Sequence, residues 1–313
     1  MPELPEVETI RVGLQKYLIG RKIIDIKIRV AKIFVGKKED VIGAKIVNLR
    51  RIGKGLIIEL DNNFVLAVHL KMTGQLIYRD AKSENIKLSP KTGGTTLPSK
   101  YSHIIFKLKN QKSNLKNDEG DAYLYYNDLR RFGWIRVVRK DELMKMPFFK
   151  EMGPEPFVGL KPSSGLKPSS GLRSSASASN FLTLNLFKNI VEGSNVSIKP
   201  LLMDQKRIGG IGNIYANDAL FEAKIDPRRK GKTLSDEEIN NLYDAIFAVI
   251  KKSLEYGGSS DENFVNALGQ EGNYQNHTLV YGREGEPCKV CRNPIEKIKL
   301  GGRGTYFCPS CQR

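Results

Sequence analysis

Four cysteines near the C-terminus constrain the fold of this chain more than any other feature. They are the only cysteines among the 313 residues and form two C-x-x-C pairs, Cys288 with Cys291 and Cys308 with Cys311. Two tight turns at this separation present four thiolates in the tetrahedral arrangement of structural zinc. Two disulfides are the alternative, but the acidic, proline-bearing start of the chain is unlike a secretion signal. We therefore expect one structural zinc ion.

The residues between the two pairs have the pattern of a β-hairpin. Short apolar stretches in residues 295–307 surround a turn of sequence GGRG, which carries Arg303. So small a module cannot bury a sufficient core by itself, and bound metal would supply much of its folding free energy. Arg303 on such a tip can approach a phosphate closely; a solvated turn arginine is the alternative. Residues 282–313 are thus predicted to be a zinc finger.

The overall charge favours a polyanionic partner. Lys and Arg number 51 against 34 Asp and Glu, a formal charge of +17, and each neutralised phosphate would release counterions. Hydrophobic residues make up 40% and charged residues 27%, a balance that excludes a wholly disordered chain. No apolar run approaches the roughly 18 to 20 residues of a membrane span. We expect a cytoplasmic protein without a membrane partner.

The first 150 residues predict one helix followed by a β-sandwich. Apolar side chains recur at helical spacing in residues 2–18, and then alternate with charged ones in residues 24–30. Two polar stretches, 80–100 and 110–121, resemble surface insertions. The further predicted strands are residues 42–47, 56–60, 64–70, 103–108, 122–126 and 135–138.

The rest of the chain is predicted to be helical after a linker. Residues 158–180 contain a repeated LKPSSG motif and alternating Ser and Ala, a composition that cannot bury apolar surface. Residues 181–265 carry helical patterns, including one that opens with a capping box and spans residues 235–254. The glycine-rich turn 209–213 precedes another helix; it is either a phosphate cradle or a plain helix connector.

The N-terminus offers nucleophilic chemistry. If Met1 is removed, Pro2 becomes a secondary amine with a pKa near ~8, so a useful fraction is neutral at physiological pH. Its attack on a sugar C1′ would give an iminium that stays cationic at any pH and acidifies the C2′ proton. Glu3 and Glu6 lie beside this amine, where one carboxyl can shuttle protons and the other can orient the site. Ordinary helix-start chemistry is the alternative.

Eight ordered motifs extend these local patterns along nearly the whole chain. They are PELPEVET (residues 2–9), RRIGK (50–54), HLKMTG (69–74), DLRRFG (128–133), GPEP (153–156), GNIYA (212–216), VYGREGEPC (280–288) and GRGT (302–305). Together they resemble the formamidopyrimidine-DNA glycosylases, the bacterial 8-oxoguanine base-excision family. This resemblance implies an α+β multidomain fold: an N-terminal helix plus β-sandwich (1–150), a helix-two-turn-helix domain (181–265), a lesion-recognition loop region (266–281) and a C-terminal zinc-finger β-hairpin.

The resemblance also implies a bifunctional enzyme that flips a damaged base out of duplex DNA. Pro2 matches the Schiff-base nucleophile, Glu3 the acid/base group and Glu6 a supporting acid. Lys54 matches the lysine that acts in β-elimination, and Arg303 the hairpin arginine implicated in δ-elimination.

Further motif positions match residues that bind DNA. Met72, Arg130 and Phe132 match the side chains that fill the gap left by the extruded base, and Asn213 matches a donor to the phosphate beside the lesion. Arg131 and His69 are also candidates. A plain basic patch is the alternative for Arg130 and Arg131, and a core histidine is the alternative for His69. Four positions depart from the usual pattern of the family: Lys71, Tyr101, Leu129 and Ser194.

The resulting prediction is a monomeric glycosylase and abasic-site lyase of the bacterial cytoplasm and nucleoid, acting on damaged double-stranded DNA that contains 8-oxoguanine or formamidopyrimidines. Two alternatives remain: a non-catalytic damaged-DNA-binding protein, and a glycosylase of the same mechanism for oxidised pyrimidines.

Overall fold

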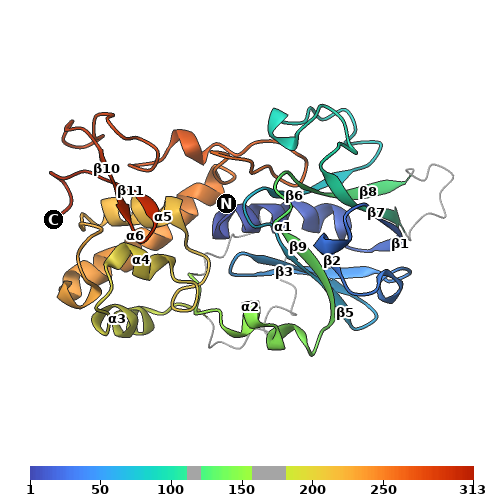
Figure 1. Cartoon of the computed structure of the whole chain (residues 1–313), viewed down its shortest axis with the longest axis horizontal. Coiled ribbons are helices and arrows are strands. Elements are labelled where there is room, and N and C mark those ends of the chain that lie inside the picture. Colours follow the sequence, from blue (N-terminus) through green and yellow to red (C-terminus); the bar gives the residue numbers. More distant parts are fainter. Residues whose placement is uncertain (111–120, 157–180) are drawn as a thin grey trace, which may run out of the picture. The chain divides into compact units, whose positions relative to one another are not determined.

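The computed structural model describes residues 1–110, 121–156 and 181–313. The predicted linker, 158–180, and most of the polar stretch 110–121 lie outside the described residues. Contacts divide the chain into two compact units, which are described separately (Figure 1). The first contains residues 1–150 and 253–276, and the second contains residues 151–252 and 277–313.

The first unit opens with helix α1, Leu4–Leu18. A capping box between Glu3 and Glu6 starts the helix, and Pro5 stands in the first turn, where its missing N–H leaves no bond unmade. The apolar residues at helical spacing are all buried, and α1 contacts strands of both sheets of this unit. The helix therefore supplies part of the core between the sheets, as its periodicity predicts.

Two antiparallel-rich sheets form the predicted sandwich. One has the strand order β1-β7-β8-β6 and the other β2-β9-β5-β4-β3, in which β2 runs parallel to β9. The strands are β1 Arg21–Ile28, β2 Phe34–Val35, β3 Ile46–Ile52, β4 Gly55–Leu60, β5 Phe64–His69, β6 Gly74–Arg79, β7 Ser102–Asn110, β8 Ala122–Asp128 and β9 Trp134–Arg139. The sequence patterns predicted neither β6 nor β2, and they placed β3 four residues too early.

Both faces of β4 and β6 are covered, which explains their lack of alternation. All six residues of each strand are buried. On β4, Ile58 faces the main core, whereas Ile57 packs with Phe149 of the short helix α2, Pro147–Lys150. A strand that is buried on both sides reads as a continuous apolar run.

The polar stretch after β6 has partners far along the chain. Residues 80–100, called the strap here, pack against residues 258–276, called the return segment. Leu88 of the strap forms a small cluster with Ile77 of β6 and Val265 of the return segment, and the Ser89 N–H donates to the Gly269 carbonyl at 2.8 Å. Much of the strap is exposed, as predicted for a surface insertion. Its Leu88 and Ser89, however, have partners about 180 residues away, which the polar composition does not indicate.

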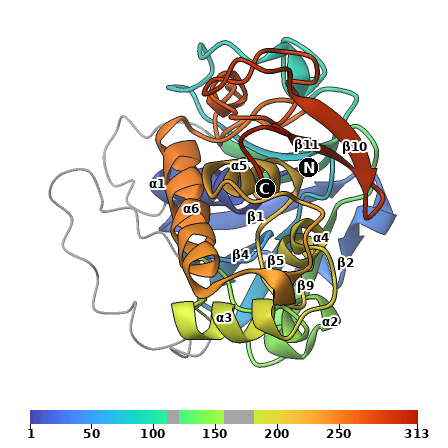
Figure 2. The same ribbon diagram turned by 90° about the vertical axis from the view of Figure 1, so that its left-hand side faces the viewer.

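The second unit combines helices with a C-terminal hairpin. Its helices are α3 Leu184–Glu192, α4 Ile198–Met203, α5 Asn213–Glu222 and most of α6 Asp236–Glu255. Strands β10, Glu296–Leu300, and β11, Arg303–Phe307, join through Gly301 and Gly302, whose positive φ angles of 57° and 75° suit a tight hairpin turn. Figure 2 shows the hairpin beside α5, where the Tyr306 N–H donates to the Asn217 side chain at 2.9 Å.

The helix–sandwich–hairpin prediction is thus confirmed. None of the helices in the described ranges is long and apolar enough to cross a membrane.

Candidate active site and nucleic-acid interface

The start of α1 is a buried carboxylate site. Glu3 is 3% exposed and Glu6 only 1%, and Pro2 is buried beside them. The Glu3 N–H donates to Glu6 Oε2 at 2.8 Å, and the Ser259 N–H of the return segment donates to Glu6 Oε1, also at 2.8 Å. Both Glu6 oxygens thus accept from backbone, so Glu6 is fixed in place as a brace between the N-terminus and the return segment.

Gly258 makes this brace possible. Its φ is +85°, and a Cβ there would lie 3.1 Å from Glu6 Oε1 and 2.9 Å from the Phe264 ring. A side chain at this position would push the return segment away from Glu6. Sequence reasoning missed Gly258 and Ser259, because nothing local to them indicates a partner about 250 residues away.

Met1 prevents nucleophilic chemistry at Pro2 for as long as it remains attached. Its ammonium group lies 3.2 Å from the Glu262 carboxylate of the return segment. While Met1 remains, the Pro2 nitrogen is an amide and has no lone pair available for attack. Removal of Met1 would leave a secondary amine at Pro2, next to the buried carboxyl groups of Glu3 and Glu6.

Lys54 lies in a turn that is linked to α1 through Arg51. The lysine is 4% exposed and lies between β3 and β4, directly after Gly53, whose φ is +56°. Arg51 donates to the Gly53 carbonyl at 2.9 Å and to Glu8 of α1 at 3.1 Å. Burial opposes ionisation of Glu8, but hydrogen bonds from Arg11 and Arg51 outweigh it and lower its pKa. The helix that carries the N-terminus thereby also fixes the Lys54 turn.

His69 stands opposite Gly55 in the β4–β5 pairing, next to that lysine turn. It is 4% exposed, and burial together with the positive charges of Lys71 and Lys54 lowers its pKa to about 3. Its Nδ1 accepts the Lys71 N–H at 2.9 Å, so the neutral ring carries its proton on Nε2. The neutral form suits a buried core histidine; the DNA contact stays a prediction.

Met72 projects from a tight turn between β5 and β6. Lys71 there has a φ of +53°, a conformation that glycine adopts more easily than lysine, so the backbone does not explain the lysine at this unusual position. Met72 itself is half-buried. Two residues on, a Cβ at Gly74 would lie 2.4 Å from the Leu70 carbonyl oxygen, so the turn closes only with glycine there.

Asp128 joins this turn to loop 128–133, which contains three further candidate DNA-binding residues. It is fully buried; Oδ1 accepts from the Thr73 hydroxyl at 2.5 Å and the Arg130 N–H at 3.2 Å, and Oδ2 accepts from the Gly133 N–H at 2.8 Å. One carboxylate therefore sets the spacing of the Met72 turn and of loop 128–133. The motif that contains Asp128 did not predict this role, although an Asp that opens a loop of this kind often caps it.

Loop 128–133 presents a cationic and aromatic surface. Arg130, Arg131 and Phe132 are exposed, Phe132 by 55%. The Arg130 guanidinium lies 4.8 Å from the centroid of the Phe132 ring, and Arg131 has a φ of +57°. An exposed ring under a guanidinium is suited to stacking on a base and to donating hydrogen bonds to it.

In the second unit, Asn213 is the first residue of α5 and follows the glycine-rich turn. Gln205 organises that turn: its amide donates to the Ile211 carbonyl at 2.7 Å and accepts from the Gly210 N–H at 3.0 Å. The Asn217 amide donates to the Asn213 carbonyl at 2.6 Å and also accepts from Tyr306 of the hairpin. Asn217, which sequence reasoning missed, thus links the Asn213 turn to the strand that begins with Arg303.

Arg303 is exposed at the start of β11. Lys199, fully buried on α4, donates to the Gly304 carbonyl at 2.8 Å and to the Thr305 hydroxyl at 2.7 Å. The hairpin tip is therefore anchored directly behind Arg303, while the arginine side chain remains exposed.

The four cysteines form a compact cluster. Their sulfur atoms all lie within 4.8 Å of one another; Cys291 and Cys308 are 3.4 Å apart, and Cys288 and Cys311 are 3.9 Å apart. A tetrahedral zinc with Zn–S bonds of about 2.3 Å requires sulfur atoms about 3.8 Å apart. The donor set and its spacing fit one structural zinc ion, as predicted.

The site residues thus divide between the two units. The first unit brings together Pro2, Glu3 and Glu6, and carries Lys54, His69, Met72, Arg130, Arg131 and Phe132; the second carries Asn213, Arg303 and the four cysteines.

Comparison with known proteins identifies three family models along the chain. Family models match at residues 1–135 (formamidopyrimidine-DNA glycosylase N-terminal domain), 175–264 (the H2TH domain of the same enzymes) and 285–313 (a zinc finger found in FPG and IleRS). Proteins named formamidopyrimidine-DNA glycosylase from Pelotomaculum thermopropionicum and Listeria innocua are 37% and 36% identical over the whole chain, covering 99% and 100% of their own lengths.

Solved structures agree with the sequence relatives. Wild-type Lactococcus lactis Fpg (MutM) bound to DNA with an N7-benzyl-Fapy-dG superposes with a TM-score of 0.78 at 32% identity, and both chains are covered completely. MutM in complex with DNA that contains carbocyclic 8-oxo-G gives the same TM-score, identity and coverage. The chain therefore belongs to the formamidopyrimidine-DNA glycosylase family.

Proposed function

We propose that this chain is a base-excision repair enzyme that removes oxidised purines, 8-oxoguanine and formamidopyrimidines, from duplex DNA and then cleaves the strand at the abasic site. The observation that carries the proposal is the buried site at the chain's start, where Pro2 precedes Glu3 and the fixed Glu6 carboxylate. Family membership along the whole chain supports the same activity.

Pro2 acts as the nucleophile once Met1 is removed. Its nitrogen lone pair bonds to C1′ of the damaged nucleotide, and the electron pair of the glycosidic bond leaves with the base, which takes up a proton. The attacking nitrogen then gives up its own proton, and its freed electron pair forms the C=N bond of the iminium as the C1′–O4′ bond breaks and the ring oxygen takes up a proton. Glu3 is the proton shuttle for these steps, because it adjoins Pro2 and Glu6 is already committed to two backbone donors.

Strand cleavage follows from the iminium. Loss of the C2′ proton expels the 3′ phosphate, and a second elimination expels the 5′ phosphate. Lys54 acts in the first elimination, from the turn that α1 fixes through Arg51 and Glu8. Arg303 acts in the second, from a hairpin whose backbone Lys199 anchors. The zinc ion would be held by the four cysteines and would stabilise that hairpin; it takes no chemical part.

The DNA-binding residues keep the base extruded and hold the backbone. Met72 and Phe132 fill the emptied stack and Arg130 hydrogen-bonds the orphaned base, supported by the Asp128 bonds that set the spacing of their loops. His69, Arg131 and Asn213 contact phosphates. A formal charge of +17 favours this partner and predicts binding that weakens steeply with salt.

Domain roles and location complete the proposal. The catalytic domain is 1–150, the linker 158–180, the helix-two-turn-helix domain 181–265, the lesion-recognition loop region 266–281 and the zinc finger 282–313. The enzyme works as a monomer on the bacterial nucleoid in the cytoplasm. Oxidised pyrimidines are a second substrate class, because wild-type Lactococcus lactis Fpg, 32% identical, has been solved with an oxidised pyrimidine containing DNA.

Glu3→Gln tests the proposal on a duplex with one 8-oxoguanine. Excision should fall at least about 100-fold, the usual contribution of a general acid or base, while affinity for the duplex stays within about twofold of wild type. The matched control is Glu262→Gln, which alters an exposed carboxylate that pairs with the ammonium of the removable Met1; it should excise normally. Unchanged excision by Glu3→Gln would refute the role of Glu3, and a wild-type chain that binds but never cleaves would establish the non-catalytic alternative.

A further inference from the structure

The strap reaches the brace that holds the N-terminal nucleophile. We propose that Lys91 of the strap is a positioning residue for this site, acting through the backbone of Ser260 and Ser259 on Glu6. The inference rests on the proposed function and assigns a role to a residue that no motif of the chain includes.

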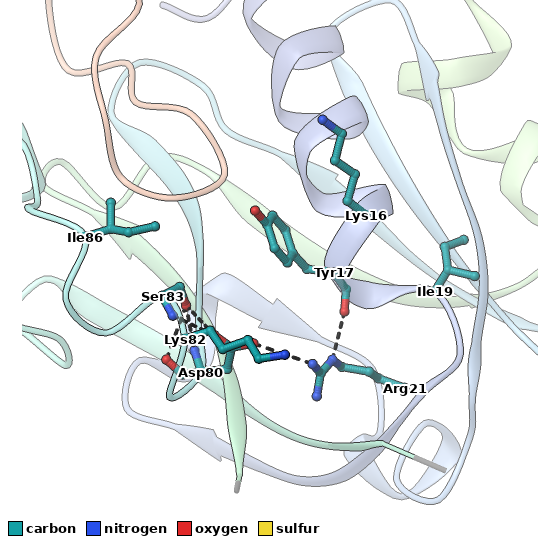
Figure 3. A pocket seen from close by; sticks show the side chains of 8 residues that line it. All are labelled: Lys16, Tyr17, Ile19, Arg21, Asp80, Lys82, Ser83 and Ile86. Carbon is teal, nitrogen blue, oxygen red and sulfur yellow. Dashed lines mark hydrogen bonds and ion pairs between the residues drawn. The ribbon is translucent and has the colours of Figure 1, made fainter. Parts of the chain in front are cut away.

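The strap is anchored firmly where it leaves β6. Asp80 accepts from the Tyr78 hydroxyl at 2.7 Å and from the Ser83 hydroxyl at 2.7 Å, and pairs with Arg21 at 3.6 Å. Figure 3 shows Arg21, Asp80 and Ser83 among the side chains that line a pocket of about 480 Å³, whose lining includes none of the candidate catalytic residues. Arg79 donates to the Ser83 carbonyl at 2.8 Å and to Leu268 of the return segment at 2.9 Å. The strap therefore starts from a fixed point.

Lys91 links the strap to the return segment through its ammonium group. It lies in a short 3₁₀ turn, Pro90–Thr92, which Ser89 caps by accepting the Lys91 N–H at 3.1 Å. The Lys91 ammonium donates to the Ser260 carbonyl and pairs with Glu271 at 2.9 Å. Glu271 also accepts from the Ser89 hydroxyl at 2.6 Å. One ammonium thus ties the strap to both ends of the return segment.

A buried amide supports this link from behind. Gln75 of β6 is fully buried, and its amide nitrogen donates to the Lys91 carbonyl at 2.9 Å and to the Asn263 carbonyl at 2.7 Å. The strap and the return segment are therefore held by a common strand as well as by each other.

Ser260 closes the return segment on itself. Its hydroxyl donates to the Phe264 carbonyl and accepts from the Gly272 N–H, both at 2.8 Å, and its N–H donates to the Gln275 side chain at 2.8 Å. The adjacent Ser259 N–H donates to Glu6. The carbonyl that Lys91 holds and the N–H that fixes Glu6 therefore belong to adjacent residues, Ser260 and Ser259, so loss of the ammonium should loosen the Glu6 brace.

The test compares Lys91→Met with Lys91→Arg, which retains a cation, and with Lys87→Met, an exposed lysine of the same strap. Two single-turnover rates are measured: excision from an 8-oxoguanine duplex and borohydride trapping on a preformed abasic duplex. Lys91→Met should slow both rates about tenfold, which is less than the rate loss of about 100-fold expected when a catalytic group is displaced by about 1 Å. Its affinity for the duplex should stay within about twofold of wild type. Lys91→Arg should recover most of the rate, and Lys87→Met should match wild type.

Hydrogen exchange of the peptide that contains Ser259 gives the readout that activity alone cannot. Lys91→Met should speed exchange there, and Lys87→Met should not. Unchanged rates or unchanged exchange in Lys91→Met would overturn the inference, as would weakened duplex binding with normal rates, which would make Lys91 a DNA contact. Inactivity of the wild-type chain on both duplexes would instead refute the proposed function, while the exchange comparison would still decide whether Lys91 fixes the segment.

Discussion

Acid should destabilise the first unit through His69, because this buried ring is neutral in the folded chain. Burial and the charges of Lys71 and Lys54 lower its pKa from the ordinary 6.5 to about 3. Replacement by Gln removes the titrating group and keeps a polar side chain of similar reach. The variant should therefore lose less stability in acid than the wild type does.

The magnitude follows from the two pKa values. The unfolded chain takes up the proton near pH 6.5, whereas the folded chain does so only near pH 3. The stability that the neutral ring contributes is complete above pH 6.5 and is lost progressively as the pH falls from 6.5 toward 3. At pH 5, which is 1.5 units below the unfolded value, the loss amounts to about 2 kcal/mol at ~1.36 kcal/mol per unit.

The single tryptophan provides the assay. Trp134 is the only tryptophan of the chain, and its ring centroid lies 5.7 Å from that of His69. Urea unfolding followed by its fluorescence, at pH 7.5 and pH 5, gives the free energy of unfolding of wild type and His69→Gln. The acid-induced loss should be about 2 kcal/mol larger in wild type; zinc release and carboxylate protonation affect both proteins alike. Equal losses, or an NMR titration of the folded His69 ring centred near pH 6.5, would refute the reasoning.

Three further predictions concern packing, charge and metal. Gly133→Ala should destabilise the protein by about 1–3 kcal/mol or more in thermal unfolding, because the new Cβ would lie 1.8 Å from the Tyr126 hydroxyl. Gly94→Ala is the control, since its Cβ would lie 3.6 Å from its nearest neighbour. Equal destabilisation by the two substitutions would contradict the packing. Glu8→Gln should destabilise by about 1–3 kcal/mol at pH 7 in urea unfolding. Because the folded pKa of Glu8 is lowered, this deficit should shrink as the pH falls below the ordinary 4.5; a constant deficit would be inconsistent with that. Cys308→Ser should abolish stoichiometric zinc binding and weaken duplex binding, measured by metal analysis and fluorescence anisotropy; normal duplex affinity without zinc would exclude the hairpin from the DNA grip.

Local patterns were sufficient for the elements whose determinants lie close together in sequence. The two cysteine pairs predicted the metal cluster, and the helical spacing after Pro2 predicted α1 with its buried face. The capping box of Ser235 and Glu238 forms as expected, with the Glu238 N–H donating to the Ser235 hydroxyl at 3.2 Å. In each case the groups that decide the structure are within a few residues of each other.

The missed features depend on contacts between distant residues. Strand β6 has no alternation because the main core covers one face, and Leu88 with Val265 covers Ile77 on the other. The polar composition of the strap did not indicate that it packs against the return segment, because that segment follows far later in the chain. Asp128, Ser259 and Gln75 act on loops and segments that their own neighbours in sequence do not indicate. The resemblance of the motifs supplied the candidate site residues, and the structure adds the hydrogen bonds that hold their loops and segments in place.

The covalent bond at Pro2 is the central claim, and mapping that bond tests it most directly. Wild-type protein, lacking Met1, is mixed with an 8-oxoguanine duplex and sodium borohydride, and the trapped adduct is digested and sequenced by mass spectrometry. The account predicts that the reduced deoxyribose is attached to the nitrogen of an N-terminal Pro2. An adduct on Lys54 or any other side chain, or full trapping by protein that retains Met1, would contradict it.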